Sequence, residues 1–277
     1  MGRFDGQVVL ISGVARGQGR SHALRFAQEG AAVIGFDLCA DQPEVAYDLA
    51  TAADLAETED AVRAAGGSIL TRIADVRDID QIRSVVADGV AEFGGVDILL
   101  ANAAVLGGAG PLWEIDDAVF QNVIETDLIG VWKTIKVAVP EILKREGHRS
   151  VIVTGSGASV KGSANIGDYV TAKHGLIGLV RTLARELGPH GVRANAVLPG
   201  NVDTQMLQNA QVKGMYFPGA PATTREVFAD AAAAASPLRV PWVDPSDISE
   251  AVLWLASPES RYVTGTALSV DAGTAIP

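Results

Sequence analysis

Short apolar runs rich in β-branched residues recur along the chain, and longer segments with apolar residues every three or four positions separate them. The first pattern is typical of buried strands and the second of amphipathic helices. The pattern predicts strands at residues 7–12, 32–37, 68–74, 96–102, 150–154, 192–198 and 266–271. It predicts helices at 20–29, 54–65, 128–143 and 169–187, and a helical stretch that ends at Gly94-Gly95. A further helix is expected at the alanine run 231–235, because alanine is the strongest helix former.

The alternation of strands and helices over the whole length predicts an α/β fold with a parallel sheet covered by helices on both faces. Because crossovers between parallel strands are right-handed, we expect this sheet to be doubly wound. No low-complexity linker divides the chain, so a single domain over residues 1–277 is expected.

Two segments, 39–53 and 201–240, interrupt this rhythm, and each follows a predicted strand. In open α/β sheets ligands bind beyond the carboxyl ends of the strands, so both segments are placed to cover a ligand. The later one carries Met206, Met215 and Phe217, which we expect to line an apolar pocket beneath a lid.

Composition narrows the classes of function. Of the 277 residues, 48% are hydrophobic, which is enough for a sizeable core, and the formal net charge of −11 argues against a nucleic-acid partner. The chain has one cysteine, Cys39, and shows neither a signal-peptide pattern nor an apolar run long enough to cross a membrane, which predicts a cytoplasmic protein. The four histidines lack metal-ligand spacing, so no metal site is expected.

A glycine-rich loop directly follows the first predicted strand and opens the first helix. It contains Gly13, Arg16, Gly17, Gln18 and Gly19. Glycines let the backbone approach a pyrophosphate, and the N-terminus of the helix offers free N–H groups and the positive end of its dipole. The strand–loop–helix context therefore predicts a dinucleotide-binding turn.

The end of the second strand indicates which dinucleotide is bound. Asp37 can accept hydrogen bonds from both ribose hydroxyls and would repel a 2′-phosphate. Leu38 stands where a phosphate-binding arginine would be useful, so NAD is the expected cofactor. Arg16 is the counter-evidence, since a basic residue in the loop could meet a 2′-phosphate.

Candidate catalytic residues lie in the second half of the chain. Tyr169 and Lys173 are four residues apart and share one face of a predicted helix. A free tyrosine has a pKa of about 10 and is a poor base, but a neighbouring ammonium favours the phenolate. Ser156 ends an earlier strand, where its hydroxyl can orient a substrate oxygen. The three together predict proton transfer to or from an alcohol or ketone.

These segments closely resemble the short-chain dehydrogenases/reductases over essentially the full chain. The resemblance rests on ISGVARGQG at 11–19, ANAA at 101–104, the Ser156/Tyr169/Lys173 set and LPGNVDT at 198–204. It implies a Rossmann-type fold in which Tyr169 is the catalytic acid–base and Lys173 also contacts the nicotinamide ribose. Further cofactor contacts are implied for Asp75, Val76, Asn102, Ala103, Pro199, Gly200, Val202 and Thr204.

One position departs from the family pattern. The family usually has an asparagine in the helix after the fourth strand, and this chain has Asp127. The resemblance implies that the main-chain carbonyl of this residue holds a water in a proton relay toward the catalytic lysine. An aspartate keeps that carbonyl, but its charge can perturb Lys173 or the water, so Asp127 is retained as a catalytic candidate.

A narrower resemblance links the segments at 17–23, 36–43 and 172–206 to the carveol dehydrogenase-like subgroup, which is associated with the redox peptide mycofactocin. It implies that the segment 39–53 is an insertion covering a tightly held NAD, and that the substrates are secondary alcohols, often terpenoid. A NAD that does not exchange would need an external redox partner. The family also implies a homotetramer, for which helices 128–143 and 169–187 carry apolar and small residues on more than one face.

The sequence thus favours NAD-dependent oxidation of a secondary alcohol to a ketone. Two alternatives remain open at this point. An NADPH-dependent ketoreductase would run the reverse reaction, against which Asp37 and Leu38 argue. A dinucleotide-sensing protein without chemistry would have no need of an activated tyrosine, and only the departure at Asp127 supports it.

Overall fold

The computed structural model describes residues 2–217 and 223–276. Its seven strands form one parallel sheet in the order β3-β2-β1-β4-β5-β6-β7. The strands are β1 (Val8–Ser12), β2 (Ala32–Asp37), β3 (Ile69–Ile73), β4 (Ile98–Ala101), β5 (Arg149–Thr154), β6 (Val192–Pro199) and β7 (Ala267–Val270). The prediction of a doubly wound parallel sheet is confirmed.

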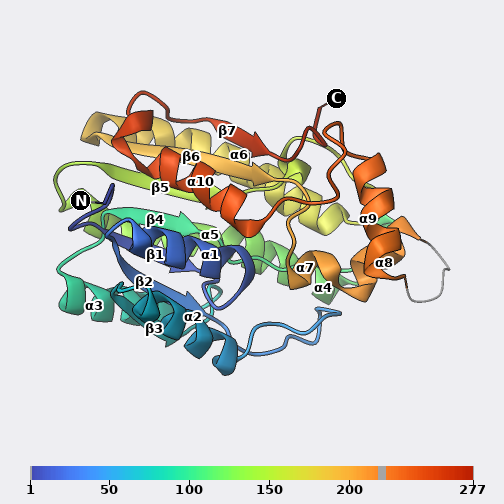
Figure 1. The fold of residues 1–277 in the computed structure, drawn as a ribbon, viewed down its shortest axis with the longest axis horizontal. Helices are drawn as coiled ribbons and strands as arrows, with labels where there is room; N and C mark the ends of the chain where they lie inside the picture. The colour runs from blue at the N-terminus through green and yellow to red at the C-terminus, as the bar shows by residue number, and fades with distance from the viewer. Residues whose placement is uncertain (1, 218–222, 277) are drawn as a thin grey trace.

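Helices cover both faces of this sheet (Figure 1). One face is covered by α1 (Gly17–Gln28), α2 (Ala52–Ala64) and α10 (Pro245–Ala256), and the other by α3 (Ile79–Phe93), α5 (Val131–Leu143) and α6 (Gly167–Leu187). Side chains alternate along each strand, so Val8 and Leu10 pack under the second set of helices while Val9 and Ile11 pack under the first. Burial on both faces explains why the strands are nearly continuous apolar runs.

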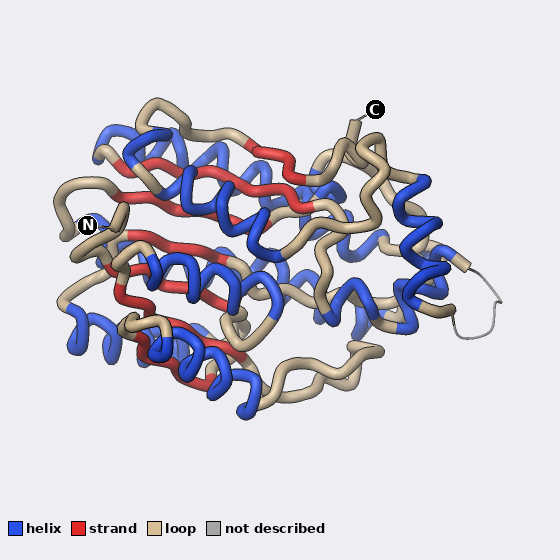
Figure 2. The backbone as a smooth tube through the Cα atoms, in the orientation of Figure 1, coloured by secondary structure: helices blue, strands red, loops and turns tan. Residues whose placement is uncertain are grey.

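The strand order reverses between β1 and β4, which are neighbours in the sheet although β2 and β3 separate them in the chain. Ligands bind at such a switch point, beyond the carboxyl ends of the strands. All strands point to the end of the molecule where α7 (Gln205–Gln208), α8 (Ala210–Tyr216) and α9 (Arg225–Ala234) lie (Figures 1 and 2). These three helices lie within the predicted lid 201–240, of which residues 218–222 fall outside the described part.

Several element boundaries differ by a few residues from the sequence prediction, and two of these differences concern the glycine loop and the insertion. Helix α1 begins at Gly17 rather than residue 20, because the glycines of the loop form its first turn. Helix α2 begins at Ala52, since Thr51 and Asp54 form a reciprocal capping box there. The insertion therefore spans 39–51, and its predicted last two residues belong to the helix.

Four of the described α-helices were not predicted from the sequence: α4 (Asp117–Ile124), α7, α8 and α10. Helices α4 and α10 start at capping aspartates, Asp116 and Asp244. Helix α4 continues through a π-helical turn, η2 (Glu125–Gly130), directly into α5, so the three form one rod with a widened turn in its middle.

Four single 3₁₀ turns complete the described helices: η1 (Leu112–Glu114), η3 (Gly157–Ser159), η4 (Gly188–His190) and η5 (Pro258–Ser260). None of the helices within the described ranges is long and apolar enough to cross a membrane. Among the same residues, no group of three or more His, Cys, Asp or Glu side chains is arranged to hold a metal ion.

Candidate active site

A cavity of about 550 Å³ lies at the carboxyl end of the sheet and brings together all but one of the candidate catalytic and cofactor-binding residues. Its lining runs from the glycine loop to the lid. The predicted residues that line it are Gly13, Arg16, Gly17, Gln18, Gly19, Asp37, Leu38, Asp75, Val76, Asn102, Ala103, Ser156, Tyr169, Lys173, Pro199, Gly200, Val202 and Thr204. Asp127 is the exception, and it lies buried behind this wall.

The glycine loop forms the part of the cavity at the start of α1. Gly13 and Gly17 have φ angles of 69° and 57°, which side chains rarely adopt. A Cβ on Gly19 would lie 1.9 Å from the carbonyl oxygen of Gly13, so only glycine permits this approach. No side chain caps α1, and its first turn contains no acidic residue. The N–H groups of that turn are therefore available to an anionic group in the cavity.

Asp37 ends β2 and faces the cavity beside this loop. Its carboxylate accepts hydrogen bonds from the backbone N–H groups of Ala15, at 3.0 Å, and Cys39, at 3.4 Å. Burial raises the pKa of Asp37, and these hydrogen bonds oppose that change. The side chain of Arg16 does not pair with Asp37 but donates to the main-chain oxygen of Asp48 in the insertion.

Two further predicted residues are held by their neighbours. Asp75 makes a bidentate ion pair with the guanidinium of Arg77, at 2.7 and 2.9 Å, which fixes its carboxylate at the cavity wall. The Asn102 amide donates to the carbonyl oxygens of Ser12 and Gly13 and accepts from the Thr154 hydroxyl. Asn102 thereby ties together the ends of β1, β4 and β5.

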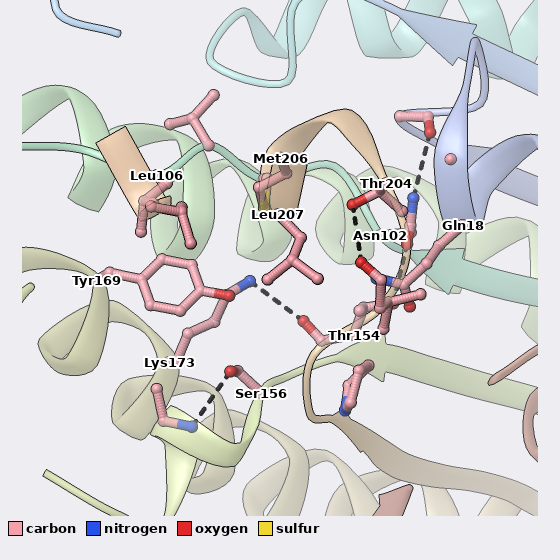
Figure 3. Close-up of a pocket in the computed structure, with 18 of the residues that line it drawn as sticks. Gln18, Asn102, Leu106, Thr154, Ser156, Tyr169, Lys173, Thr204, Met206 and Leu207 are labelled. Atoms are coloured by element: carbon pink, nitrogen blue, oxygen red, sulfur yellow. Dashed lines mark hydrogen bonds between the residues drawn. The ribbon is translucent and has the colours of Figure 1, made fainter. Parts of the chain in front are cut away.

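Ser156, Tyr169 and Lys173 point into one part of the cavity (Figure 3). Ser156 follows β5 and accepts a hydrogen bond from Ala158 N–H at 3.1 Å. Tyr169 and Lys173 lie one turn apart on α6, and the Lys173 ammonium is 5.2 Å from the centre of the Tyr169 ring. Lys173 is almost fully buried and donates to the carbonyl oxygen of Thr154 at 3.3 Å.

Asp127 lies in the π-helical turn η2 and is completely buried. One carboxylate oxygen lies 3.2 Å from the Lys173 ammonium, and the other accepts a hydrogen bond from Val105 N–H at 2.8 Å. Burial disfavours the charged form of Lys173, but the attraction of Asp127 together with that of Tyr169 outweighs it, so the pKa of Lys173 lies above its ordinary value. Burial also raises the pKa of Asp127, while the ammonium opposes that rise.

The lid forms the remaining wall. Its apolar side chains pack with Leu106 and Tyr169 into a cluster centred on Phe228, which we call the lid cluster. The other buried members are Leu207, Val212 and Ala232. Met206 and Met215 line the cavity as expected, whereas Phe217 packs on the lid cluster without lining the cavity. Tyr216, which ends α8 and directly precedes Phe217, lines the cavity instead.

The sequence analysis missed Tyr47 and Leu49 of the insertion, which reach the cavity. The Tyr47 hydroxyl accepts a hydrogen bond from Leu106 N–H at 3.0 Å and packs on the lid cluster. Burial raises the pKa of Tyr47, which keeps it a neutral phenol. A tyrosine within a segment expected to cover a ligand was the signal that could have identified it.

Comparisons with known proteins agree with this geometry. The family model described as "Enoyl-(Acyl carrier protein) reductase" matches residues 13–275. The (-)-trans-carveol dehydrogenase of Rhodococcus erythropolis is 43% identical over 276 residues, which cover 100% of both chains.

Two solved structures are similar throughout. Carveol dehydrogenase from Mycobacterium avium in complex with NAD is 47% identical, with a TM-score of 0.98 and 100% of both chains covered. A short chain dehydrogenase from Mycobacterium paratuberculosis bound to NAD is 37% identical, with a TM-score of 0.90 and 99% of both chains covered. The chain belongs to the short-chain dehydrogenase/reductase family of oxidoreductases.

Proposed function

We propose that this protein is an NAD-dependent dehydrogenase that oxidises a secondary alcohol to a ketone. The observation that carries the proposal is the convergence of Ser156, Tyr169 and Lys173 on one cavity that also contains the glycine loop and Asp37. The relatives named as carveol dehydrogenases support the same reaction class.

The residues of the cavity fit NAD. The uncapped first turn of α1 and the glycine backbone would hold the pyrophosphate, and Asp37 would hold the adenosine ribose. Arg16, which the sequence left as a candidate partner of a 2′-phosphate, is engaged with the insertion through Asp48. The carboxylate of Asp37 lines the cavity beside this loop and repels a 2′-phosphate. This favours NAD over NADP.

In the proposed mechanism Tyr169 removes the hydroxyl proton of the alcohol. Lys173 places a positive charge beside the tyrosine ring and thereby favours its deprotonated form. Ser156 donates a hydrogen bond to the substrate oxygen as it becomes a carbonyl. NAD, when bound, supplies the acceptor for the hydride.

Replacing Tyr169 by Phe tests this mechanism, because it removes only the ionisable oxygen. We expect turnover of an accepted alcohol to fall about 10³-fold while NADH still binds, since acid–base groups contribute roughly 10²–10⁴-fold. Tyr262, which is 89% exposed and does not line the cavity, provides a matched Tyr→Phe control that should keep its turnover. A Y169F protein with most of its activity would contradict the mechanism. A wild-type protein that binds NADH but turns over no alcohol would favour a sensor.

The lid supports a substrate class for this reaction. Met206, Met215 and Leu207 line the cavity with adaptable apolar side chains, which suit a cyclic or terpenoid secondary alcohol. Figure 3 shows Leu106, Met206 and Leu207 gathered on the same side of the tyrosine ring.

The insertion supports slow exchange of NAD, because it touches both ends of the cavity. Asp48 is bound to Arg16 of the glycine loop, and Tyr47 is bound to Leu106 beside the lid. A retained NAD would require an external redox partner, for which mycofactocin is our candidate.

We further propose that the protein acts in the cytoplasm. Assembly into a homotetramer through α5 and α6 also stays a prediction. Trp132 on α5 is 43% exposed and offers an apolar side chain for such an interface.

A further inference from the structure

The buried ion pair between Lys173 and Asp127 has no role in the mechanism above. Both side chains are almost completely removed from solvent, with exposed fractions of 1% and 0%. Bringing two charges into the interior is costly, and attraction offsets the cost only when the geometry is good and the remaining atoms are hydrogen-bonded. Here Thr154 accepts from the ammonium and Val105 donates to the carboxylate.

The pair changes what Lys173 can do for Tyr169. A lone ammonium would present a full positive charge to the tyrosine, whereas a carboxylate 3.2 Å from the ammonium offsets much of that charge. The same carboxylate keeps the buried lysine protonated, which burial alone would oppose. Asp127 therefore has two electrostatic effects, one on the charge state of Lys173 and one on the field that reaches Tyr169.

We propose, on the basis of the function proposed above, that Asp127 is a positioning residue which holds Lys173 ionised and limits the positive field that the lysine exerts on Tyr169. Asp127 does not line the cavity, so it acts through Lys173 rather than on the substrate. The assignment gives the side chain of Asp127 a role of its own, distinct from the main-chain carbonyl that the family resemblance implied.

Other titratable groups face the same region. Asp168 and Tyr169 come from α6, and Tyr47 comes from the insertion. Burial raises the pKa of Asp168, whose carboxylate accepts from Tyr169 N–H at 2.8 Å. Asp168 forms no ion pair with Lys173, which makes it the appropriate comparison. Burial also raises the pKa of Tyr47, so this side chain stays neutral over the pH range of activity.

The substitution Asp127→Asn tests the proposal, because the amide keeps an oxygen for Val105 N–H and places an uncharged NH2 group where the charged oxygen faced Lys173. Without the carboxylate, the phenolate of Tyr169 is easier to form. In a plot of kcat for alcohol oxidation against pH, the rising limb should therefore move to lower pH. Lys173 should also lose its proton at lower pH, so the falling limb should move the same way. We expect the optimum of kcat to shift by about one pH unit toward acid.

The matched control is Asp168→Asn, which removes a second buried carboxylate near the tyrosine without breaking the ion pair. A clearly smaller shift in this variant supports the proposal, whereas an equal shift assigns the effect to general charge near the site. An unchanged profile in D127N overturns the proposal. Loss of activity in Y169F, measured in parallel, reports on the proposed function alone, so the two failures are distinguishable.

A second measurement needs no variant at position 127. In wild-type protein with ¹³C-labelled aspartate and ¹⁵N-labelled lysine, the carboxyl resonance coupled in space to Lys173 Nζ identifies Asp127. The proposal requires this carboxyl to be ionised across the pH range of activity. A protonated carboxyl in that range would overturn it, whatever the folding of D127N.

Discussion

The two segments that cover the cavity are held in different ways. The insertion 39–51 has no helix. Hydrogen bonds tie it to its surroundings through Asp48 and Tyr47, and Val45, Leu49 and Tyr47 add partly buried apolar contacts. The lid consists of α7, α8 and α9, which pack on the lid cluster. Within that cluster Phe228 is completely buried, and its ring lies 5.0 Å from that of Tyr216 and 5.7 Å from that of Trp242.

This difference indicates how each cover can open. Hydrogen bonds can be lost one at a time, and each contributes about 1 kcal/mol, so the insertion can release in small steps. A packed aromatic cluster loses its contacts together, because the side chains share one buried volume. The insertion therefore relies more on separable hydrogen bonds than the lid does, although Tyr47 also packs on the lid cluster, whereas the lid is held as a cooperative unit.

The largest effect is expected from breaking the lid cluster. Phe228→Ala should lower the free energy of unfolding by about 3–5 kcal/mol, or unfold the lid locally, because it leaves a large cavity. Thermal unfolding and hydrogen exchange of α8 and α9 measure the two outcomes. Val227, the preceding residue on α9, is 49% exposed, and Val227→Ala should change stability by no more than about 0.5 kcal/mol. Equal stability of both variants would show that the lid is not held by this cluster.

A smaller effect is expected from removing one contact of the insertion. Tyr47→Phe leaves the buried N–H of Leu106 without its acceptor, which costs about 1–2 kcal/mol in the closed state. NAD should then dissociate roughly tenfold faster in stopped-flow displacement, with global stability little changed. Tyr262→Phe provides the exposed control. Identical release rates in the wild type and Y47F would exclude Tyr47 as a restraint on the cofactor.

The smallest effect is expected on cofactor preference, when the charge of Asp37 just before the insertion is removed. Asp37→Asn removes the carboxylate charge and keeps one oxygen, which can accept from Ala15 N–H or from Cys39 N–H but not from both. The ratio of the Kd for NADP to the Kd for NAD should fall about fivefold, which corresponds to roughly 1 kcal/mol. Isothermal titration with both cofactors measures it. If the ratio stays constant, the charge of Asp37 does not set the preference.

The sequence predicted the sheet and most of the cavity because both follow from local patterns. Apolar runs ended by Gly13, Asp37 and Asn102 mark strand ends, and parallel strands bring their carboxyl ends to one edge. The Tyr169/Lys173 pair needed only the spacing of a helix.

Contacts between distant segments were beyond that reasoning. Nothing in the spacing of Tyr47 and Leu106 indicates that a loop after β2 reaches the loop after β4. The ion pair of Asp127 with Lys173 likewise depends on how two helices pack. Sequence periodicity gives the face of a residue on its own element, but the partner across the interface comes from tertiary structure.

The widened turn η2 affects which side chains lie on one face of the continuous helix from α4 to α5. Val123, Asp127, Val131 and Ile135 follow one another at intervals of four and are all buried. A regular helix advances about 100° per residue, so each such step would rotate the line by about 40°, and three steps would carry Ile135 a third of the way round the axis. A π-helical turn takes up an extra residue and corrects part of this drift. Asp127 is thus the single charged member of an otherwise apolar line, and the register that directs it toward Lys173 is the same register that keeps Val131 and Ile135 in the core.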